Sequence, residues 1–144
     1  MNCDGVCKDC KNDYAKERLY RGKRIYGGEW FVGNQFWMVR RQGDDRCDRE
    51  AVLSDGFRSV TIDLKTLGEF TGAIDGKGNK IFEGDIIDHP YWVVTYCSGM
   101  KCFSGMQVGW YLQRDNWEGW MELQNTDNHA VIGNIHDNPE LWRR

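Results

Sequence analysis

The sequence has no long apolar run, little proline and almost no net charge. Each of these shortages excludes a class of protein. No segment approaches the roughly 20 apolar residues that a membrane-spanning helix needs, so we expect no membrane partner. No apolar stretch follows a basic start, as it would in a signal peptide. The net charge of −3 creates no overall field that would draw the chain onto nucleic acid or an anionic membrane. We therefore expect a cytoplasmic protein.

The chain also lacks an apolar stripe of helical period, and it has two prolines, whereas signals for β-strands recur along it. Short runs rich in aromatic and β-branched residues alternate with clusters of Gly, Asn and Asp, which is typical of a small barrel or sandwich. The pair Gly27-Gly28 between two such runs predicts a hairpin with a tight turn. The expected strands cover residues 19–25, 29–39, 59–62, 81–87, 91–97, 106–112, 119–123 and 130–135.

Helix signals are confined to three short stretches. Asp63 is placed to cap a single turn that ends at Gly68, and Asn12-Asp13 is placed to cap a short helix over residues 14–19. Asn138-Pro139 indicates an N-cap followed by proline at the first helical position. With so little helix, the chain is predicted to be mainly β.

The most distinctive segment, which we call the signature run, extends from Thr71 to Asp85 and has the sequence T-G-A-I-D-G-K-G-N-K-I-F-E-G-D. Residues 75–79 tolerate positive φ and predict a sharp turn, with an extended segment after it. Gly72 to Lys77 lacks the glycine spacing and the hydroxyl of a phosphate loop. Lys77 also stands where a calcium loop needs an oxygen ligand. The run is therefore predicted to fold the chain rather than to bind phosphate or calcium.

Half of the six cysteines cluster in a polar tail over residues 1–12. They are Cys3, Cys7 and Cys10. Clustered thiolates can hold structural zinc or an iron–sulfur cluster, although the cluster would need a much larger barrel around it. Zinc would need a fourth ligand, for which Cys47, His89 or a neighbouring chain are the candidates. The interpretation we favour is a tail of reduced thiols, with no metal and no other cofactor.

The sequence contains no pattern of catalytic residues. No nucleophile elbow and no paired-histidine metal motif accompanies the three histidines, which are His89, His129 and His136. Glu83 and Asp85 would share one face of an extended segment and could act as acid and base. Gly84 between them instead favours a bulge, with the carboxylates bound to turn amides. We therefore expect the chain not to be an enzyme.

A section rich in basic and aromatic residues, over residues 18–41, supports a binding hypothesis. Lysine and arginine neutralise phosphates, and aromatic rings stack on bases. The alternative is that the aromatic side chains form core and the charges form a solvated face, and the alternation puts basic residues on both faces of the expected hairpin. The candidate binding residues are Arg21, Lys23, Arg24, Trp30, Trp37, Arg40 and Arg41.

Four segments together resemble the YopX family, small proteins encoded in bacteriophages and prophages. They are residues 21–33, residues 61–72, the signature run continued to Ile87, and residues 131–141. The sequence departs from the family at Leu64, where proline is usual, and at Gly76, where lysine is more frequent. The residues that form the structural signature are Thr71, Gly72, Asp75, Gly78, Glu83, Gly84, Asp85, Gly133, Asn134, Asn138 and Pro139.

The resemblance implies a mainly β fold in which an N-terminal β-hairpin subdomain packs with a C-terminal SH3-like barrel. The expected boundaries are a cysteine-rich tail over residues 1–12, an N-terminal β subdomain over 13–67 and the barrel over 68–144. The resemblance also implies the cytoplasm of a bacterial host cell and assembly into homo-oligomers. It implies no catalytic residue.

These observations favour a phage or prophage accessory protein that acts without catalysis, by binding a protein partner or a second copy of itself. A barrel offers peptides an aromatic groove, for which the candidates are Trp92, Trp110, Trp117 and Trp120. Nucleic-acid binding through the basic hairpin is the alternative. A small enzyme is the third hypothesis, and it requires a polar pocket at His89, Glu83 or Asp85.

Overall fold

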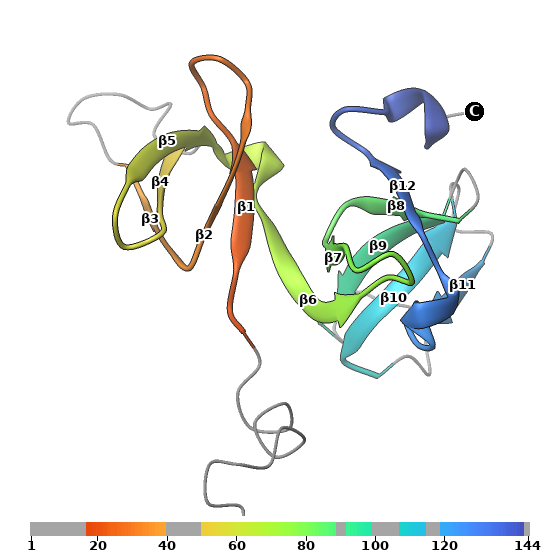
Figure 1. The fold of residues 1–144 in the computed structure, drawn as a ribbon. Helices are drawn as coiled ribbons and strands as arrows, with labels where there is room; N and C mark the ends of the chain where they lie inside the picture. The colour runs from red at the N-terminus through yellow and green to blue at the C-terminus, as the bar shows by residue number, and fades with distance from the viewer. Residues whose placement is uncertain (1–16, 40–49, 89–91, 99–106, 115–118, 143–144) are drawn as a thin grey trace, which may run out of the picture.

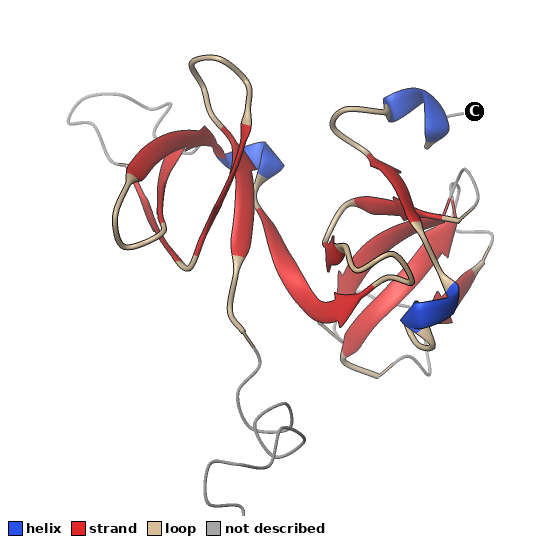
Figure 2. Cartoon of the chain, in the orientation of Figure 1, coloured by secondary structure: helices blue, strands red, loops and turns tan. Residues whose placement is uncertain are grey.

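A computed structural model describes residues 17–39, 50–88, 92–98, 107–114 and 119–142. Strands and turns make up most of these residues, as Figure 2 shows. The strands are β1 (Tyr20–Lys23), β2 (Trp30–Gly33), β3 (Gln35–Met38), β4 (Glu50–Ser54), β5 (Ser59–Asp63), β6 (Gly68–Ile74), β7 (Lys80–Phe82), β8 (Asp85–Ile87), β9 (Trp92–Cys97), β10 (Gly109–Arg114), β11 (Trp120–Glu122) and β12 (Val131–Asn134). The prediction of a mainly β chain is confirmed.

The strands form two lobes that β6 connects (Figure 1). We call β1–β5 the N-terminal lobe and β7–β12 the C-terminal lobe. The start of β6 pairs with β1, where Gly68 lies opposite Arg21, and its later part pairs with β7, where Phe70 lies opposite Phe82. This strand was not expected from the sequence, and it makes one sheet, β2-β1-β6-β7, common to both lobes.

In the N-terminal lobe, a second sheet of order β3-β4-β5 curls back towards β1. Arg24 bridges Ile62, and the Ile25 N–H donates to the Thr61 carbonyl at 3.1 Å, which joins the end of β1 to β5. The strands enclose a buried apolar cluster, which consists of Phe31, Ala51, Leu53 and Ile62. Burying side chains of the size of leucine and isoleucine contributes about 1.5–3 kcal/mol each.

The expected hairpin of residues 19–25 and 29–39 is confirmed in its first part, because β1 pairs antiparallel with β2. Its turn is wider than predicted, since the Arg24 N–H donates to the Glu29 carbonyl across four residues. The continuation to residue 39 is wrong. The chain bends after Gly33 and enters the other sheet as β3, and a Cβ at Gly33 would lie 2.4 Å from the Ser54 carbonyl oxygen. The bend therefore requires glycine.

In the C-terminal lobe, a five-stranded antiparallel sheet has the order β11-β10-β9-β8-β12. The expected single strand over residues 81–87 is instead two strands, β7 and β8, separated by a turn at Glu83-Gly84 in which Gly84 has φ 88°. The lobe encloses its own buried apolar cluster, which consists of Ile81, Ile87, Val94 and Leu112. The sheet does not close among the described residues, so the SH3-like barrel stays a prediction.

The short helices are single 3₁₀ turns. Asp63 caps the turn Leu64–Thr66 by accepting from the Lys65 N–H at 3.0 Å, as predicted, and the turn ends at Leu67 rather than Gly68. A turn over Pro139–Leu141 has proline at its start, also as predicted. Of the helix expected over residues 14–19, the described residues 17–19 are not helical. A further 3₁₀ turn, Thr126–Asn128, was not expected.

Two further findings concern the length of the helices and the state of one cysteine. None of the helices in the described part of the chain is long and apolar enough to cross a membrane. Cys97, at the end of β9, is buried and disulfide-bonded, and the other five cysteines lie outside the described residues. The reduced thiols expected in the tail lie outside the described residues, and the disulfide at Cys97 was not expected from the sequence.

Candidate functional site

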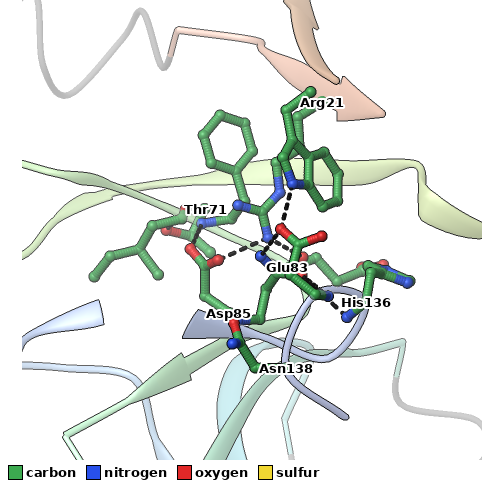
Figure 3. Close-up of polar contacts among 11 residues, drawn as sticks. Arg21, Thr71, Glu83, Asp85, His136 and Asn138 are labelled. Carbon is green, nitrogen blue, oxygen red and sulfur yellow. Dashed lines mark hydrogen bonds and ion pairs between the residues drawn. The ribbon is translucent and has the colours of Figure 1, made fainter. Parts of the chain in front are cut away.

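Polar side chains from both lobes meet beside the start of β6, at a place we call the junction (Figure 3). β1 and β2 contribute one side, while the signature run and the loop after β12 contribute the other. The residues that define the junction are Arg21, Lys23, Trp30, Asp85, Asn134 and Asp137.

Arg21 of β1 connects the two lobes through a salt bridge to Asp85 and a cation–π contact with Phe82. Its Nη2 donates to Asp85 Oδ1 at 2.7 Å and reaches the Glu83 carbonyl at 3.4 Å. The guanidinium carbon lies 4.7 Å from the Trp30 ring centroid and 4.9 Å from that of Phe82. A planar, delocalised cation suits such a position between two rings. The side chain is 13% exposed, so Arg21 is committed to the junction.

Asp85 completes this link from the signature run. While Oδ1 accepts from Arg21, Oδ2 accepts from the buried Phe82 N–H at 2.8 Å. The carboxylate therefore closes the turn between β7 and β8 and also holds the N-terminal lobe. Burial raises the pKa of Asp85, and the Arg21 charge and the Phe82 hydrogen bond oppose that rise.

Asp137 provides a second link, nearer the surface. It accepts from Lys23 Nζ, from Trp30 Nε1 at 2.6 Å and from Asn134 Nδ2 at 3.0 Å. Burial alone would raise the pKa of Asp137, but the hydrogen bonds from Lys23 and Trp30 outweigh it and lower the pKa to about 2. The carboxylate is therefore ionised at neutral pH.

The loop after β12 holds Asp137 in place. Asn134 Oδ1 accepts from the N–H groups of His136 and Asp137, at 3.0 and 2.9 Å. Asn138 Oδ1 accepts from the Asn134 N–H at 3.3 Å, and Pro139 begins the last 3₁₀ turn. A Cβ at Gly133 would lie 2.5 Å from Asn138 Oδ1. These hydrogen bonds and the close approach at Gly133 give the residues of this loop a structural role.

Asp75 organises the turn of the signature run. Its carboxylate accepts from the N–H groups of Lys77, Asn79 and Val131, at 2.9, 2.8 and 3.0 Å. Burial would raise the pKa of Asp75, but these hydrogen bonds lower it to about 2. Gly78 supplies a positive φ of 85° within the turn. The carboxylate therefore ties the turn to β12.

Thr71 and Gly72 shape β6 itself. Thr71 Oγ1 donates to the Ile81 carbonyl at 2.8 Å and accepts from the Ala73 N–H at 3.2 Å. The register of β6 against β7 shifts between Phe70 and Ile74, and Gly72 at this bulge has φ 90°. Bulges bend a strand, and this one lies in the strand that joins the lobes.

A cavity of about 240 Å³ lies beside the junction, between the C-terminal lobe and the segment of Lys65 and Leu67 that leads into β6. Its walls combine the polar groups of Glu83, Gln113 and His136 with the apolar side chains of Ile135 and Trp142. Burial and the charge of Glu69 raise the pKa of Glu83. Burial and the charge of Arg21 lower the pKa of His136, so its ring is neutral at pH 7.

Among the described residues that line this cavity, none is an activated nucleophile. Thr95 and Lys65 line it, and neither is hydrogen-bonded to Glu83 or His136 in the described structure. Of the other groups named for catalysis, Asp85 is in the ion pair, His129 pairs with Asp88, and His89 lies outside the described residues.

The basic residues proposed for nucleic-acid binding do not form one free patch. Arg21 and Lys23 pair with carboxylates of the C-terminal lobe, and Arg24 pairs with Glu29 at 3.6 Å. Trp30 lies in the junction. Arg40 and Arg41 lie outside the described residues.

Trp37 has a different environment, on the edge strand β3. All four residues of β3 are exposed, with Phe36 at 40%, Trp37 at 49% and Met38 at 46%. β3 pairs with β4, and no other described strand pairs with its second edge. Trp120 and Met121 are also exposed, on the edge strand β11. Of the other tryptophans proposed for a groove, Trp92 and Trp110 pack against the core, and Trp117 lies outside the described residues.

The candidate zinc ligands Cys3, Cys7 and Cys10 lie outside the described residues. Within the described ranges, no group of three His, Cys, Asp or Glu side chains is arranged to hold a metal ion. Zinc binding in the tail stays a prediction.

Sequence reasoning missed the two features most relevant to binding. The prediction of one strand over residues 29–39 does not reveal that β3 is a separate strand with an exposed edge. The cavity joins residues from six segments, and no local pattern marks Trp142 or Gln113 as its lining.

Comparisons with known proteins agree with the resemblance found in the sequence. No curated protein matches the chain. Among solved structures, the chain is similar to the crystal structure of protein EF1440 from Enterococcus faecalis. The two chains share 19% sequence identity, and the alignment covers 88% of this chain and 98% of that chain. The TM-score is 0.36, so we infer nothing about fold or function from this similarity. The model of the YopX protein family matches residues 19–143, nearly the whole chain. The chain therefore belongs to the YopX family.

Proposed function

We propose that the protein is a non-enzymatic binding module that adds a strand of a partner polypeptide to the edge of β3. The observation that supports this most directly is the row of exposed apolar side chains, Phe36, Trp37 and Met38, on a strand whose second edge pairs with no described strand. Proteins normally protect such edges with charge, proline or a covering segment. Exposed aromatic residues on an open edge mark a site for strand addition.

The backbone of β3 suits this role. The Val39 N–H donates to the Glu50 carbonyl at 3.3 Å, and hydrogen-bonded pairs alternate along an antiparallel ladder. Trp37 and Gln35 therefore bond to β4, whereas the N–H groups of Phe36 and Met38 point to the open edge. A partner strand would find two donors there, with Trp37 beside them.

The two other hypotheses have less support. The salt bridges of Arg21 and Lys23 occupy two of the basic groups that would contact phosphates. The cavity offers an acid and a base without an activated nucleophile. Membership of the YopX family supports a phage or prophage accessory role, and the partner is then a protein of the phage or of its host, or a second copy of the chain.

Photo-crosslinking in the producing cells tests this function. A benzophenone amino acid at position 37 should give a discrete higher-mass adduct, and Met38→Pro should abolish it by removing an outward N–H without removing a bond to β4. The matched control is the same group at Phe57, which is 98% exposed but lies in a turn. Equal adducts at both positions, or an adduct that survives Met38→Pro, would contradict the proposal.

A further inference from the structure

The cavity beside Glu83 is too small for a drug-sized ligand, because such sites begin at about 300 Å³ and this one encloses about 240 Å³. It is large enough for a single long side chain. Leu67, Val93, Ile135 and Trp142 give it apolar walls, while Glu83, Gln113 and His136 place polar groups in it. Lys65 also lines the cavity, and within the described residues no salt bridge joins its ammonium group to Glu83. The site is therefore shaped for a group with an apolar stem and a polar head.

The charge of that head follows from Glu83. Its side chain is partly buried, and its carboxylate accepts no hydrogen bond and lies within 4 Å of no cation in the described structure. Burial and the neighbouring Glu69 charge both disfavour its ionised form. A partly buried carboxylate with a like charge beside it is stabilised by an incoming cation.

The remaining polar groups favour several N–H donors on one head. The neutral His136 ring can accept a hydrogen bond, and so can the Gln113 amide oxygen. His136 Nε2 lies close to the Glu83-Gly84 turn, 3.8 Å from the position of a Cβ on Gly84, so it adjoins Glu83. Guanidinium carries five donors in a rigid fork and stacks on aromatic rings such as that of Trp142, whereas ammonium is a point charge.

We propose that this cavity receives an arginine side chain of a bound polypeptide, with Glu83 as the counter-ion and His136 and Gln113 as further acceptors. The inference rests on the proposed function in one respect, namely that the arginine belongs to a protein partner. It does not depend on β3, because no residue of β3 lines the cavity.

The test is an NMR titration of the whole chain with N-acetyl-arginine amide. Its matched control is N-acetyl-citrulline amide, which has the same shape without the charge. Arginine amide should shift the Trp142 indole and His136 ring signals, and the citrulline and lysine analogues should bind at least about tenfold more weakly. Glu83→Gln should weaken arginine binding by a similar factor and leave citrulline binding unchanged. Glu122→Gln, at an exposed position on β11, should change neither.

Shifts of equal size with citrulline, no localised shift with arginine, or unchanged binding in a folded Glu83→Gln variant would overturn the inference. The two proposals fail separately. An adduct at position 37 with no arginine binding would remove the arginine site and keep strand addition. Arginine binding with no adduct at position 37 would remove strand addition and keep the site.

Discussion

The junction and the edge of β3 differ in almost every physical respect. The junction joins two lobes through carboxylates whose oxygens are engaged, and Asp85 is 2% exposed there. The edge of β3 exposes three large apolar side chains, and two of its N–H groups point away from β4. Apart from the buried Arg21 Nε, which has no hydrogen-bond partner among the described residues, the polar groups of the junction are paired, whereas the edge leaves both apolar surface and donors to be covered.

The residues that identify the family differ from the residues that we expect to bind a partner polypeptide, which lie on the edge of β3. The signature residues bend β6, close the turn at Gly84 and link the lobes, so changing them should damage the fold. Among the edge residues, Phe36 packs edge-to-face on Tyr20, whereas Trp37 is 49% exposed, so changing Trp37 should affect binding alone. Four substitutions test that separation, from the largest expected change in stability to the smallest.

Breaking the Arg21–Asp85 pair should have the largest effect. Removing one partner leaves a buried charge uncompensated, which costs about 3–5 kcal/mol. We expect Arg21→Met to lower the free energy of unfolding by this amount in urea titrations. The double variant Arg21→Met, Asp85→Leu should recover part of the loss, since neither charge then remains. A single variant as stable as the parent would show that the junction does not hold the lobes.

Acid should weaken the protein through Asp75. Its folded pKa of about 2 lies below the ordinary value of about 3.9, so its contribution is complete above about pH 5 and is lost as the pH falls towards 2. The difference corresponds to about 2.5 kcal/mol. We expect Asp75→Asn to lower stability by about that amount at pH 6 and by much less at pH 2.5. An equal loss at both pH values would contradict this assignment.

Replacing Gly84 should have a smaller effect. Its φ of 88° is unfavourable for a residue with a Cβ, at about 1–2 kcal/mol. A Cβ added at this position would lie 3.5 Å from its nearest neighbour, an atom of Ile135, so crowding adds little. Gly84→Ala should therefore lower the melting temperature moderately, and Gly28→Ala, at an exposed positive φ, provides the matched control.

Changing the edge of β3 should affect stability least. Trp37 is 49% exposed, and surface substitutions of this kind usually change stability by less than about 0.5 kcal/mol. Trp37→Glu should leave the urea midpoint nearly unchanged and abolish capture of the partner found by crosslinking. A large loss of stability would mean that Trp37 belongs to the core.

The sequence was informative where local chemistry decides the structure. Alternation and caps located the β1–β2 hairpin, β5, β9, β12 and the turn capped by Asp63. β6 was missed because Gly68 and Gly72 indicate a break in a strand. Both glycines instead lie within β6. A Cβ at Gly68 would lie 2.8 Å from the Glu83 carbonyl oxygen, and Gly72 forms the bulge.

The candidate site was harder to predict because its contacts are distant in the chain. Arg21 and Asp85 are 64 residues apart, and no spacing rule pairs them. The sequence favoured a bulge at Gly84 with carboxylates bound to turn amides, and Asp85 does accept from the Phe82 N–H across the turn at Gly84. Asp85 enters the ion pair, while Glu83 lines the cavity. Two carboxylates with one residue between them therefore have different roles.

Amide hydrogen exchange on the isolated chain compares the two regions most directly, because exchange reports the opening of each hydrogen bond. The Phe82 N–H, which donates to Asp85 in a buried position, should exchange only with large-scale unfolding. The N–H groups of Phe36 and Met38 should exchange fast. Protection of Phe36 and Met38 equal to that of Phe82 would contradict the account, because it would mean that the edge of β3 is already covered.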